Sequence, residues 1–211
     1  MIAIIDYGLG NIKNIQRAVE HLGYNSILTD QPSEISQADA IILPGVGHFR
    51  DAMQAIASRN LITTLQQITN IPVIGICLGM QLMYEHSAEG DVDGLKLIPG
   101  IVTPIKTTYP VPHLGWNNLS SSIPTLNKDV YFVHSYQAEM SPYVVAYADY
   151  GTLIPAIVQY KNFTGIQFHP EKSGMYGLSI LNQALQGGFS NDQTLASNLF
   201  NQCNKRQTNR R

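Results

Sequence analysis

Short apolar runs and amphipathic stretches alternate along the first half of the chain. The runs are rich in β-branched residues and end at glycine, proline or polar residues, a pattern typical of buried strands. They lie at residues 1–5, 40–43 and 73–76, with a weaker run near 25–28. Because four such runs are separated by stretches of a different period, the pattern predicts strands joined by helices.

The stretch after the first run repeats apolar residues at helical spacing. These residues are Ile12, Ile15, Val19 and Leu22. Asn11 precedes them as a candidate N-terminal cap and Gly23 follows them as a stop, which predicts one helix. Further helices are expected over 49–68 and 78–85. Strands alternating with helices indicate a parallel sheet covered on both faces.

The second half of the chain has a different pattern, with short β-rich runs and many turn residues. The runs lie at 101–102, 131–133, 144–147, 156–160 and 165–168. They predict antiparallel or mixed strands, followed by a last helix over 177–185. We therefore expect a single α/β domain with a mixed, mostly parallel sheet, flanking helices and a β-rich second half. The domain is expected to span 1–200.

Composition agrees with a folded domain and narrows its partners. The chain has 211 residues, of which 44% are hydrophobic and 13% charged, and its net charge is -2. These values exclude a disordered chain, and they indicate neither a general nucleic-acid binder nor a membrane binder. The polar, basic residues 201–211 are expected to form a disordered tail, with an electrostatic arm as the alternative.

The cysteines indicate a reducing compartment. There are two, too few for a disulfide framework, and the first residues predict a strand and not a signal peptide. We therefore expect a cytoplasmic protein with both thiols reduced. Cys203 lies in the polar tail, far from any glycine turn, and is expected to have no role.

Cys77 lies between glycines in the sequence GICLG, residues 75–79, where a predicted strand meets a predicted helix. This is the form of a nucleophile elbow with sulfur in place of oxygen, in which a strained turn is expected to hold the nucleophile in the open. The helix N-terminus favours thiolate, and the N–H of Leu78 can face a developing oxyanion. The alternative is a small buried cysteine whose neighbouring glycines allow close packing.

A general base and its orienting group are found in the sequence HPE, residues 169–171. In an extended segment, residues two apart point the same way, so His169 and Glu171 can meet on one face. His169 can accept the thiol proton, and Glu171 can fix the tautomer of its ring. The alternative is an ordinary surface histidine and glutamate beside a turn.

A glycine-rich loop, PGVGH at 44–48, follows another predicted strand. Loops at the carboxyl ends of neighbouring parallel strands lie side by side, so this loop can approach the cysteine and supply a second oxyanion donor. The alternative is a turn that needs glycine only for a positive φ. It lacks the lysine and hydroxyl residue of a phosphate-binding loop.

Together these three motifs resemble the class I, or triad-type, glutamine amidotransferases. Four more motifs narrow the resemblance to the glutaminase subunits of imidazole glycerol phosphate synthase, over about residues 1–185. They are DYGLGN at 6–11, PHLGWN at 112–117, YFVHSY at 131–136 and QFHPEKS at 167–173. The resemblance implies hydrolysis of L-glutamine to L-glutamate and ammonia through a cysteinyl thioester, in histidine biosynthesis.

The resemblance also implies a role for each matching residue. Cys77 would be the nucleophile, His169 the base, Glu171 its partner, and the N–H groups of Val46 and Leu78 the oxyanion hole. Further positions match those expected around the bound glutamine. These are Gly47, Gln81, Glu89 and Ser135. The Glu89 carboxylate can pair with the substrate ammonium group, although a solvated loop acid is an equal alternative.

The implied partner is a HisF-type cyclase, which would form a heterodimer with this chain and receive the ammonia through an interior channel. Asn11, Tyr131 and Lys172 match positions that would face it. Trp116 is expected in the core, with a partner contact as the alternative. No metal or cofactor is implied. The remaining histidines, among them His48, His113 and His134, lack zinc spacing and are expected to make structural or interface hydrogen bonds.

Three other functions stay open from the sequence. Many of the glutaminases that the chain resembles have a serine near position 14, which this chain lacks, and its polar tail is unusually long. Both differences leave room for a paralogue that feeds ammonia to another acceptor, such as an amidated surface sugar. A hydrolase of γ-glutamyl compounds that works without a partner is a second alternative. A catalytically silent interaction subunit is a third, against which the complete cysteine, histidine and glutamate set argues.

Overall fold

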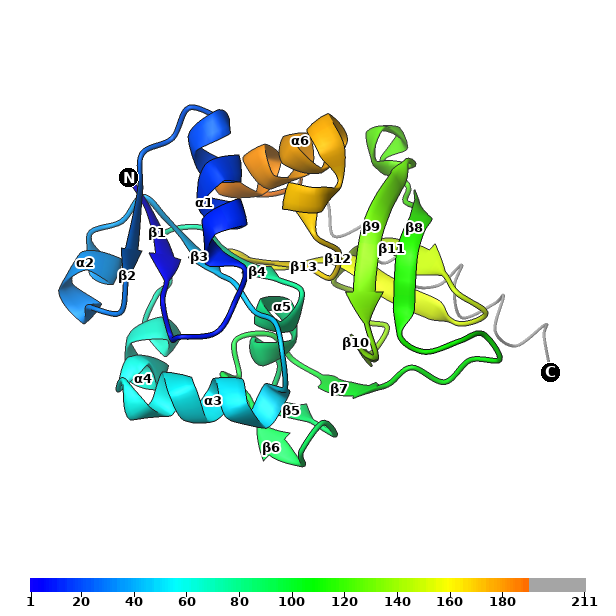
Figure 1. The fold of residues 1–211 in the computed structure, drawn as a ribbon, viewed down its shortest axis with the longest axis horizontal. Coiled ribbons are helices and arrows are strands. Elements are labelled where there is room, and N and C mark those ends of the chain that lie inside the picture. The colour runs from blue at the N-terminus through cyan, green and yellow to red at the C-terminus, as the bar shows by residue number, and fades with distance from the viewer. Residues whose placement is uncertain (190–211) are drawn as a thin grey trace.

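The computed structural model describes residues 1–189 of the chain (Figure 1). The expected tail at 201–211 and Cys203 lie outside the described residues. The helices are α1 Ile12–His21, α2 Pro32–Ser36, α3 Phe49–Ser58, α4 Leu61–Gln66, α5 Leu78–Leu82 and α6 Gly174–Leu185, with 3-10 turns η1 Pro124–Leu126 and η2 Pro170–Lys172. In the part of the chain that the structure describes, no helix has both the length and the apolar character needed to cross a membrane.

Within residues 1–189, nine strands form a large sheet in the order β2-β1-β3-β4-β13-β12-β11-β8-β9. A smaller sheet has the order β10-β7-β5-β6. The strands of the first half are β1 Ile2–Ile5, β2 Ser26–Thr29, β3 Ala40–Leu43, β4 Val73–Ile76, β5 His86–Ser87 and β6 Val92–Asp93. Those of the second half are β7 Ile101–Pro104, β8 His113–Ser120, β9 Asp129–His134, β10 Tyr136–Ala138, β11 Val144–Asp149, β12 Leu153–Tyr160 and β13 Phe163–Ile166.

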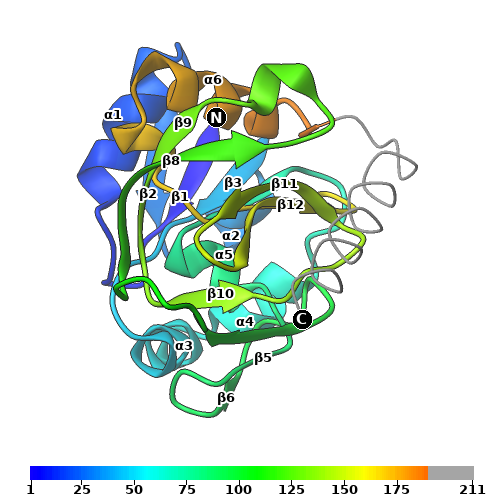
Figure 2. The ribbon, with the colours of Figure 1, turned by 90° about the vertical axis from the view of Figure 1, so that its right-hand side faces the viewer.

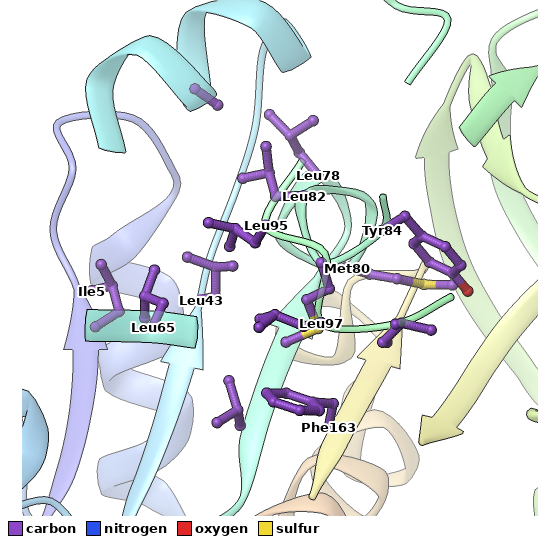
Figure 3. Packing of buried hydrophobic residues seen from close by; sticks show 14 of the residues in the cluster. Ile5, Leu43, Leu65, Leu78, Met80, Leu82, Tyr84, Leu95, Leu97 and Phe163 are labelled. Atoms are coloured by element: carbon purple, nitrogen blue, oxygen red, sulfur yellow. The ribbon is translucent and has the colours of Figure 1, made fainter. Parts of the chain in front are cut away.

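Helices cover both faces of the large sheet, as the alternating pattern predicts. Side chains of a strand point alternately to its two faces, so Ile2 and Ile4 of β1 join one apolar cluster while Ala3 and Ile5 join the other. The first cluster is covered by α1 and α6, and the second by α3, α4 and α5 (Figure 1). Figure 3 shows the second cluster, where Leu43 packs near residues of α4 and α5.

The two halves of the large sheet differ in direction. The pairs from β2 to β13 are parallel, and the pairs from β13 through β12, β11 and β8 to β9 are antiparallel. The prediction of a mixed sheet with a β-rich second half is confirmed. Figure 1 and Figure 2 both show β9 beside α6, while β10 lies on the side of the molecule nearer to α3.

Several local predictions differ from the structure. The helix expected over 49–68 is two helices, because Asn60 adopts a left-handed conformation with φ 56° between them. The helix expected to reach residue 85 ends at Leu82. Asn11 is the N-cap residue of α1, but its side chain makes no capping hydrogen bond. Neither the short helix α2 nor the long strand β8 was expected.

Candidate active site

Cys77 connects β4 to α5 and carries the strain of the turn itself. Its backbone has φ 55° and ψ -111°, a conformation that L-residues rarely adopt. Its N–H donates to the carbonyl of Ile166 in the neighbouring strand, at 2.7 Å. The elbow predicted from the glycines is present, but the positive φ falls on the cysteine and not on Gly75 or Gly79.

The glycines of the elbow allow close packing instead. A Cβ at Gly79 would lie 1.9 Å from the carbonyl oxygen of Leu43, and a Cβ at Gly75 would lie 2.6 Å from the oxygen of Gly79. A Cβ at Gly45 would lie 2.6 Å from the nitrogen of Gly79. These contacts bring α5 directly against the end of β3 and the loop that follows it. The glycine loop therefore lies beside the cysteine, as the order of the strands predicted.

The Cys77 side chain is buried, with 6% of the residue exposed, and reaches solvent at a pocket of about 410 Å³. The pocket is lined by Val46, Gly47, Cys77, Leu78, Gln81, Glu89, Pro112, Val133, His134, Ser135, Tyr136, His169 and Lys172. An exposed thiol was expected at the tip of the elbow, and in this respect the expectation is wrong. Burial in a pocket leaves the sulfur accessible only to a molecule that fits there.

His169 and Glu171 meet as predicted. Nδ1 of His169 lies 2.8 Å from Oε1 of Glu171, and only 3% and 1% of the two side chains are exposed. The other ring nitrogen, Nε2, is buried and makes no hydrogen bond with the described residues. Burial lowers the pKa of His169, but the nearby Cys77 and the hydrogen-bonded Glu171 outweigh burial and raise it to about 9. The ring therefore favours its charged form beside the cysteine.

A buried hydroxyl group holds the histidine segment in place. Oγ of Ser173 donates to the carbonyl of His169 at 2.7 Å and accepts the N–H of Tyr131 at 3.0 Å. The N–H of His169 in turn donates to the carbonyl of Tyr131 at 2.9 Å. The position of His169 thus depends on β9, a strand of the antiparallel half of the sheet. Ser173 lies in one of the matching motifs but had no predicted role.

The two residues expected to supply oxyanion donors, Val46 and Leu78, both line the pocket. Leu78 is the first residue of α5, so its N–H has no acceptor within the helix. Val46 and Gly47 line the pocket, and Gly47 has φ 100°, which a side chain would strain. The loop begins at Pro44, whose carbonyl accepts a hydrogen bond of 2.5 Å from the buried hydroxyl of Tyr7.

Two buried amide side chains border the cysteine. Nε2 of Gln81 donates to the carbonyl of Tyr136 at 2.9 Å and to Oε1 of Gln167 at 3.0 Å. Nε2 of Gln167 faces Sγ of Cys77 at 3.9 Å. Gln81 lies in the pocket wall, as expected. Gln167 has no exposed surface and was missed, although a polar residue two places before His169 in an apolar run was a usable signal.

Glu89 is half-buried in the loop between β5 and β6 and makes a specific contact there. Its Oε2 accepts the N–H of Phe49, the first residue of α3, at 2.9 Å, and the residue lines the pocket. A carboxylate at this position satisfies a free N–H of the helix N-terminus and interacts favourably with the helix dipole. Ser135 also lines the pocket, and its carbonyl accepts the N–H of Ile105 at 2.9 Å. All four residues expected around glutamine therefore meet at one pocket.

Comparison with known proteins gives the family. Residues 3–185 match the family described as glutamine amidotransferase class-I. The chain is 70% identical over 198 residues to imidazole glycerol phosphate synthase subunit HisH of Staphylococcus saprophyticus, covering 94% of this chain and 100% of that protein. It is 66% identical over 192 residues to the protein of the same name from Staphylococcus epidermidis, covering 91% and 100%. This chain belongs to the HisH family of class I glutamine amidotransferases.

Solved structures with lower identity share the fold. A structure described as a glutamine amidotransferase superposes with a TM-score of 0.73 at 15% identity, covering 89% of this chain and 100% of that one. A glutamine amidotransferase from Thermotoga maritima gives a TM-score of 0.56 at 16% identity, covering 95% and 90%. The α/β architecture of the HisH-family chain is thus that of other amidotransferases.

The residues expected to face a partner divide into two groups. Lys172 lines the pocket mouth, and its Nζ lies 5.9 Å from the ring centroid of Tyr131. Trp116 packs edge-on against the same ring and is 59% exposed, so its expected place in the core is wrong. Asn11 lies apart, at the start of α1, and does not line the pocket.

His48, His113 and His134 all make hydrogen bonds within the described part of the chain. Among the described residues, no group of three or more histidine, cysteine, aspartate or glutamate side chains could hold a metal ion. His113 and His134 make hydrogen bonds inside the protein, as expected, and His134 additionally lines the pocket. His48 caps α3, where its Nδ1 accepts the N–H of Arg50 at 3.2 Å.

Proposed function

We propose that this chain is a glutaminase subunit that hydrolyses L-glutamine to L-glutamate and ammonia, with Cys77 as nucleophile. The observation that carries the proposal is the buried pair of His169 and Glu171 at a pocket that also contains Cys77 at a helix N-terminus. The relatives named HisH, of which the chain covers the whole length, support the same assignment.

The first half of the reaction forms a thioester. The Cys77 thiolate attacks the amide carbon of the glutamine side chain, and the N–H groups of Val46 and Leu78 stabilise the oxyanion of the tetrahedral intermediate. The His169 imidazolium donates its proton to the leaving nitrogen, so that the C–N bond breaks and ammonia departs. Glu171 holds the ring through Nδ1 and stabilises its positive charge throughout.

The second half releases glutamate. His169, now neutral, accepts a proton from water, and the resulting hydroxide attacks the thioester carbonyl within the same oxyanion hole. The C–S bond breaks, and the thiolate and imidazolium are restored. Gly47, Gln81, Glu89 and Ser135 surround the substrate in this proposal. The Glu89 carboxylate is the one acidic group of the pocket wall suited to the substrate ammonium group.

The ammonia would pass to a HisF-type cyclase, because free ammonia is protonated and lost in water. The name of the Staphylococcus saprophyticus relative describes it as a subunit of imidazole glycerol phosphate synthase, which supports such a heterodimer in histidine biosynthesis. Tyr131 and Lys172, beside the pocket mouth, are placed in this interface, and Asn11 with them. We assign the complex to the cytoplasm, and residues 1–200 to one amidotransferase domain.

The rate of glutamate release tests the proposal directly. The purified chain is assayed with glutamine alone, and then with a HisF-type cyclase and its nucleotide ligand. We expect low activity alone and a large increase with the liganded cyclase, both absent in Cys77→Ala. Activity that ignores the cyclase would retain the glutaminase and point to another ammonia acceptor. Activity that survives in Cys77→Ala would overturn the assignment of the nucleophile.

A further inference from the structure

Two buried histidines lie side by side at the pocket, where His134 belongs to the wall and His113 lies outside the lining. His113 of β8 and His134 of β9 are directly opposite each other in the antiparallel pair, and Nδ1 of His113 lies 3.1 Å from Nε2 of His134. Only 2% and 6% of the two residues are exposed. Two ring nitrogens at hydrogen-bond distance need one donor and one acceptor, so the tautomers of the two rings depend on each other.

The outer end of this pair is a donor. Nδ2 of Asn117 lies 3.2 Å from Nε2 of His113 and also donates to the carbonyl of Asp149 at 3.1 Å. Oδ1 of Asn117 accepts the N–H of Asn118 at 2.8 Å. Because a carbonyl only accepts and an N–H only donates, both contacts fix the orientation of the amide group. Nε2 of His113 must therefore be an acceptor, and the proton of a neutral ring lies on Nδ1.

The inner end is an acceptor. Nδ1 of His134 lies 2.8 Å from the carbonyl oxygen of Tyr136. A carbonyl requires a donor, so His134 also carries its proton on Nδ1 and leaves Nε2 to accept from His113. The two ends independently give the same tautomers. The hydrogen bonds from Asn117 through both rings to Tyr136 all point the same way, and we refer to these four residues as the histidine chain.

The rings are held neutral and fixed. The ring of His113 stacks between Phe132, at 4.5 Å, and Tyr150, at 4.0 Å between centroids. Burial lowers the pKa of His113 to about 4. Burial also lowers the pKa of His134, to about 3, against the opposing effect of its hydrogen bond to Tyr136. A neutral His134 matters at this place, because a positive charge there would oppose the imidazolium form of nearby His169.

The histidine chain ends on an atom that organises the pocket. The Tyr136 carbonyl accepts from His134 and from Nε2 of Gln81, which uses both of its lone pairs. His134, Ser135 and Tyr136 form one wall of the pocket, and Gln81 borders it from α5. The peptide after Tyr136 and the amide group of Gln81 therefore take their orientation from the same contact.

We propose that His134, and behind it His113 and Asn117, are positioning residues that set the wall of the glutamine pocket by directing a single N–H at the Tyr136 carbonyl. None of the three is required to touch the reacting atoms. The inference deepens the proposed function and rests on it for its kinetic consequence. The tautomers of the rings do not depend on that function and are tested separately.

Nitrogen NMR of the histidine rings in the full-length protein tests the direction of the hydrogen bonds in the histidine chain. Each ring carries a proton on Nδ1 and none on Nε2 at neutral pH if the proposal holds; His113→Gln and His134→Asn assign the signals. A proton on Nε2 of either ring in the wild-type protein overturns it. This NMR experiment gives an answer even if the protein proves to have no glutaminase activity.

Asn117→Asp replaces the hydrogen-bond donor at the outer end of the histidine chain with an acceptor. A carboxylate only accepts, so His113 must acquire a proton on Nε2, either as the other tautomer or as imidazolium. Asn118→Asp is the matched control, because it makes the same charge change at the next position of β8, whose side chain is exposed. We expect the His113 signal to change only in Asn117→Asp. An unchanged His113 signal in that variant overturns the proposal.

Glutamine kinetics with the cyclase present test the consequence for the pocket. His134→Leu removes the donor to Tyr136 at nearly constant volume, whereas His134→Asn keeps an N–H at the position of Nδ1. We expect His134→Leu to raise KM about tenfold with kcat changed less than about threefold, and His134→Asn to recover most of the loss. Equal KM values in the wild type and both variants would overturn the positioning role.

Two controls keep the kinetic result interpretable. If wild-type chain with cyclase releases no glutamate, the proposed function fails and the NMR result alone judges the histidine chain. If His134→Leu does not fold, as shown by circular dichroism, Asn117→Ala replaces it, because this side chain lies outside the pocket lining and is only half-buried. A rise in KM is again expected, and an unchanged KM counts against the proposal.

Discussion

Gly79 lies against Leu43 so closely that a Cβ on the glycine would be 1.9 Å from the carbonyl oxygen of the leucine. The oxygen belongs to the backbone of a central strand and cannot move aside. We predict that Gly79→Ala lowers the free energy of unfolding by about 3 kcal/mol or more and displaces the elbow. Gly23→Ala is the control, since φ 87° strains it but no atom lies within 4 Å, and should cost about 1 kcal/mol. Urea unfolding of both variants decides.

Because the backbone of Cys77 is strained, substitutions at this position can have the same effect on activity but different effects on stability. Cys77→Ala and Cys77→Gly are both expected to abolish glutamate release. Glycine tolerates φ 55° with ψ -111° and alanine does not, so Cys77→Gly should be the more stable of the two by about 1 kcal/mol. Denaturant unfolding measures the free energy of unfolding of both variants. A more stable alanine variant would contradict the proposed backbone strain at Cys77.

The charge of His169 depends on its two neighbours. Burial alone lowers its pKa, while Cys77 and Glu171 raise it to about 9, so both Cys77→Ala and Glu171→Gln should lower the pKa. The raised pKa stabilises the folded protein fully below pH 6.5, and this contribution is lost as pH rises through about 9. NMR titration of the ring measures the pKa in each variant. A pKa unchanged in both would contradict the interaction.

The buried pair His113 and His134 has the opposite pH dependence. Burial lowers the pKa values from 6.5 to about 4 and about 3, so the folded protein binds fewer protons than the unfolded chain in acid. Their contribution to stability is present above pH 6.5 and is lost as pH falls through about 4 for His113 and about 3 for His134, at up to about 1.4 kcal/mol per pH unit for each ring.

Unfolding by urea, followed from neutral pH into the acid range, measures this dependence. We expect the double variant His113→Gln with His134→Asn to be less stable than the wild type at neutral pH but to lose less stability in acid. Equal slopes in the two proteins would show that the rings do not control acid unfolding.

Ser173 joins two backbone groups through a single buried hydroxyl. Ser173→Ala leaves the N–H of Tyr131 and the carbonyl of His169 without the hydroxyl group, at a cost of about 2 kcal/mol. Ser179→Ala is the matched control, because its hydroxyl bonds only to the Tyr176 carbonyl on an exposed surface. Thermal unfolding compares the two variants. Equal losses of stability would show that the two hydrogen bonds of Ser173 stabilise the protein no more than the single exposed bond of Ser179.

The sequence predicted elements whose signal is local. The apolar run of β3 matches its strand residue for residue, because buried parallel strands are continuous apolar runs. β8 escaped prediction, because Gly115 and the neighbouring asparagines are rare in strands and because its exposed positions include the apolar Leu114 and Trp116. The left-handed Asn60 divided one expected helix into two, since a single residue's φ is not visible in a hydrophobic pattern.

The site shows the same limit. The spacing of His169 and Glu171 is local, so their contact could be predicted from the sequence. The contacts of Gln167 with Gln81, and of His113 with His134, depend on which elements become neighbours in the fold, and nothing in either segment alone indicates its partner. The position of Trp116 was misjudged for a related reason. Its burial depends on what covers β8, not on its own hydrophobicity.

The insertion of β13 beside β4 has a consequence for how the protein is made. The two strands are neighbours in the sheet, yet β13 is the last strand in the described residues, 1–189, and is synthesised well after β4. Cys77 is therefore synthesised long before His169, and the two meet only when the parallel half of the sheet is completed from the far end of the chain. A nascent or truncated chain would carry the thiol without its base, and the site would be assembled in the closing step of folding.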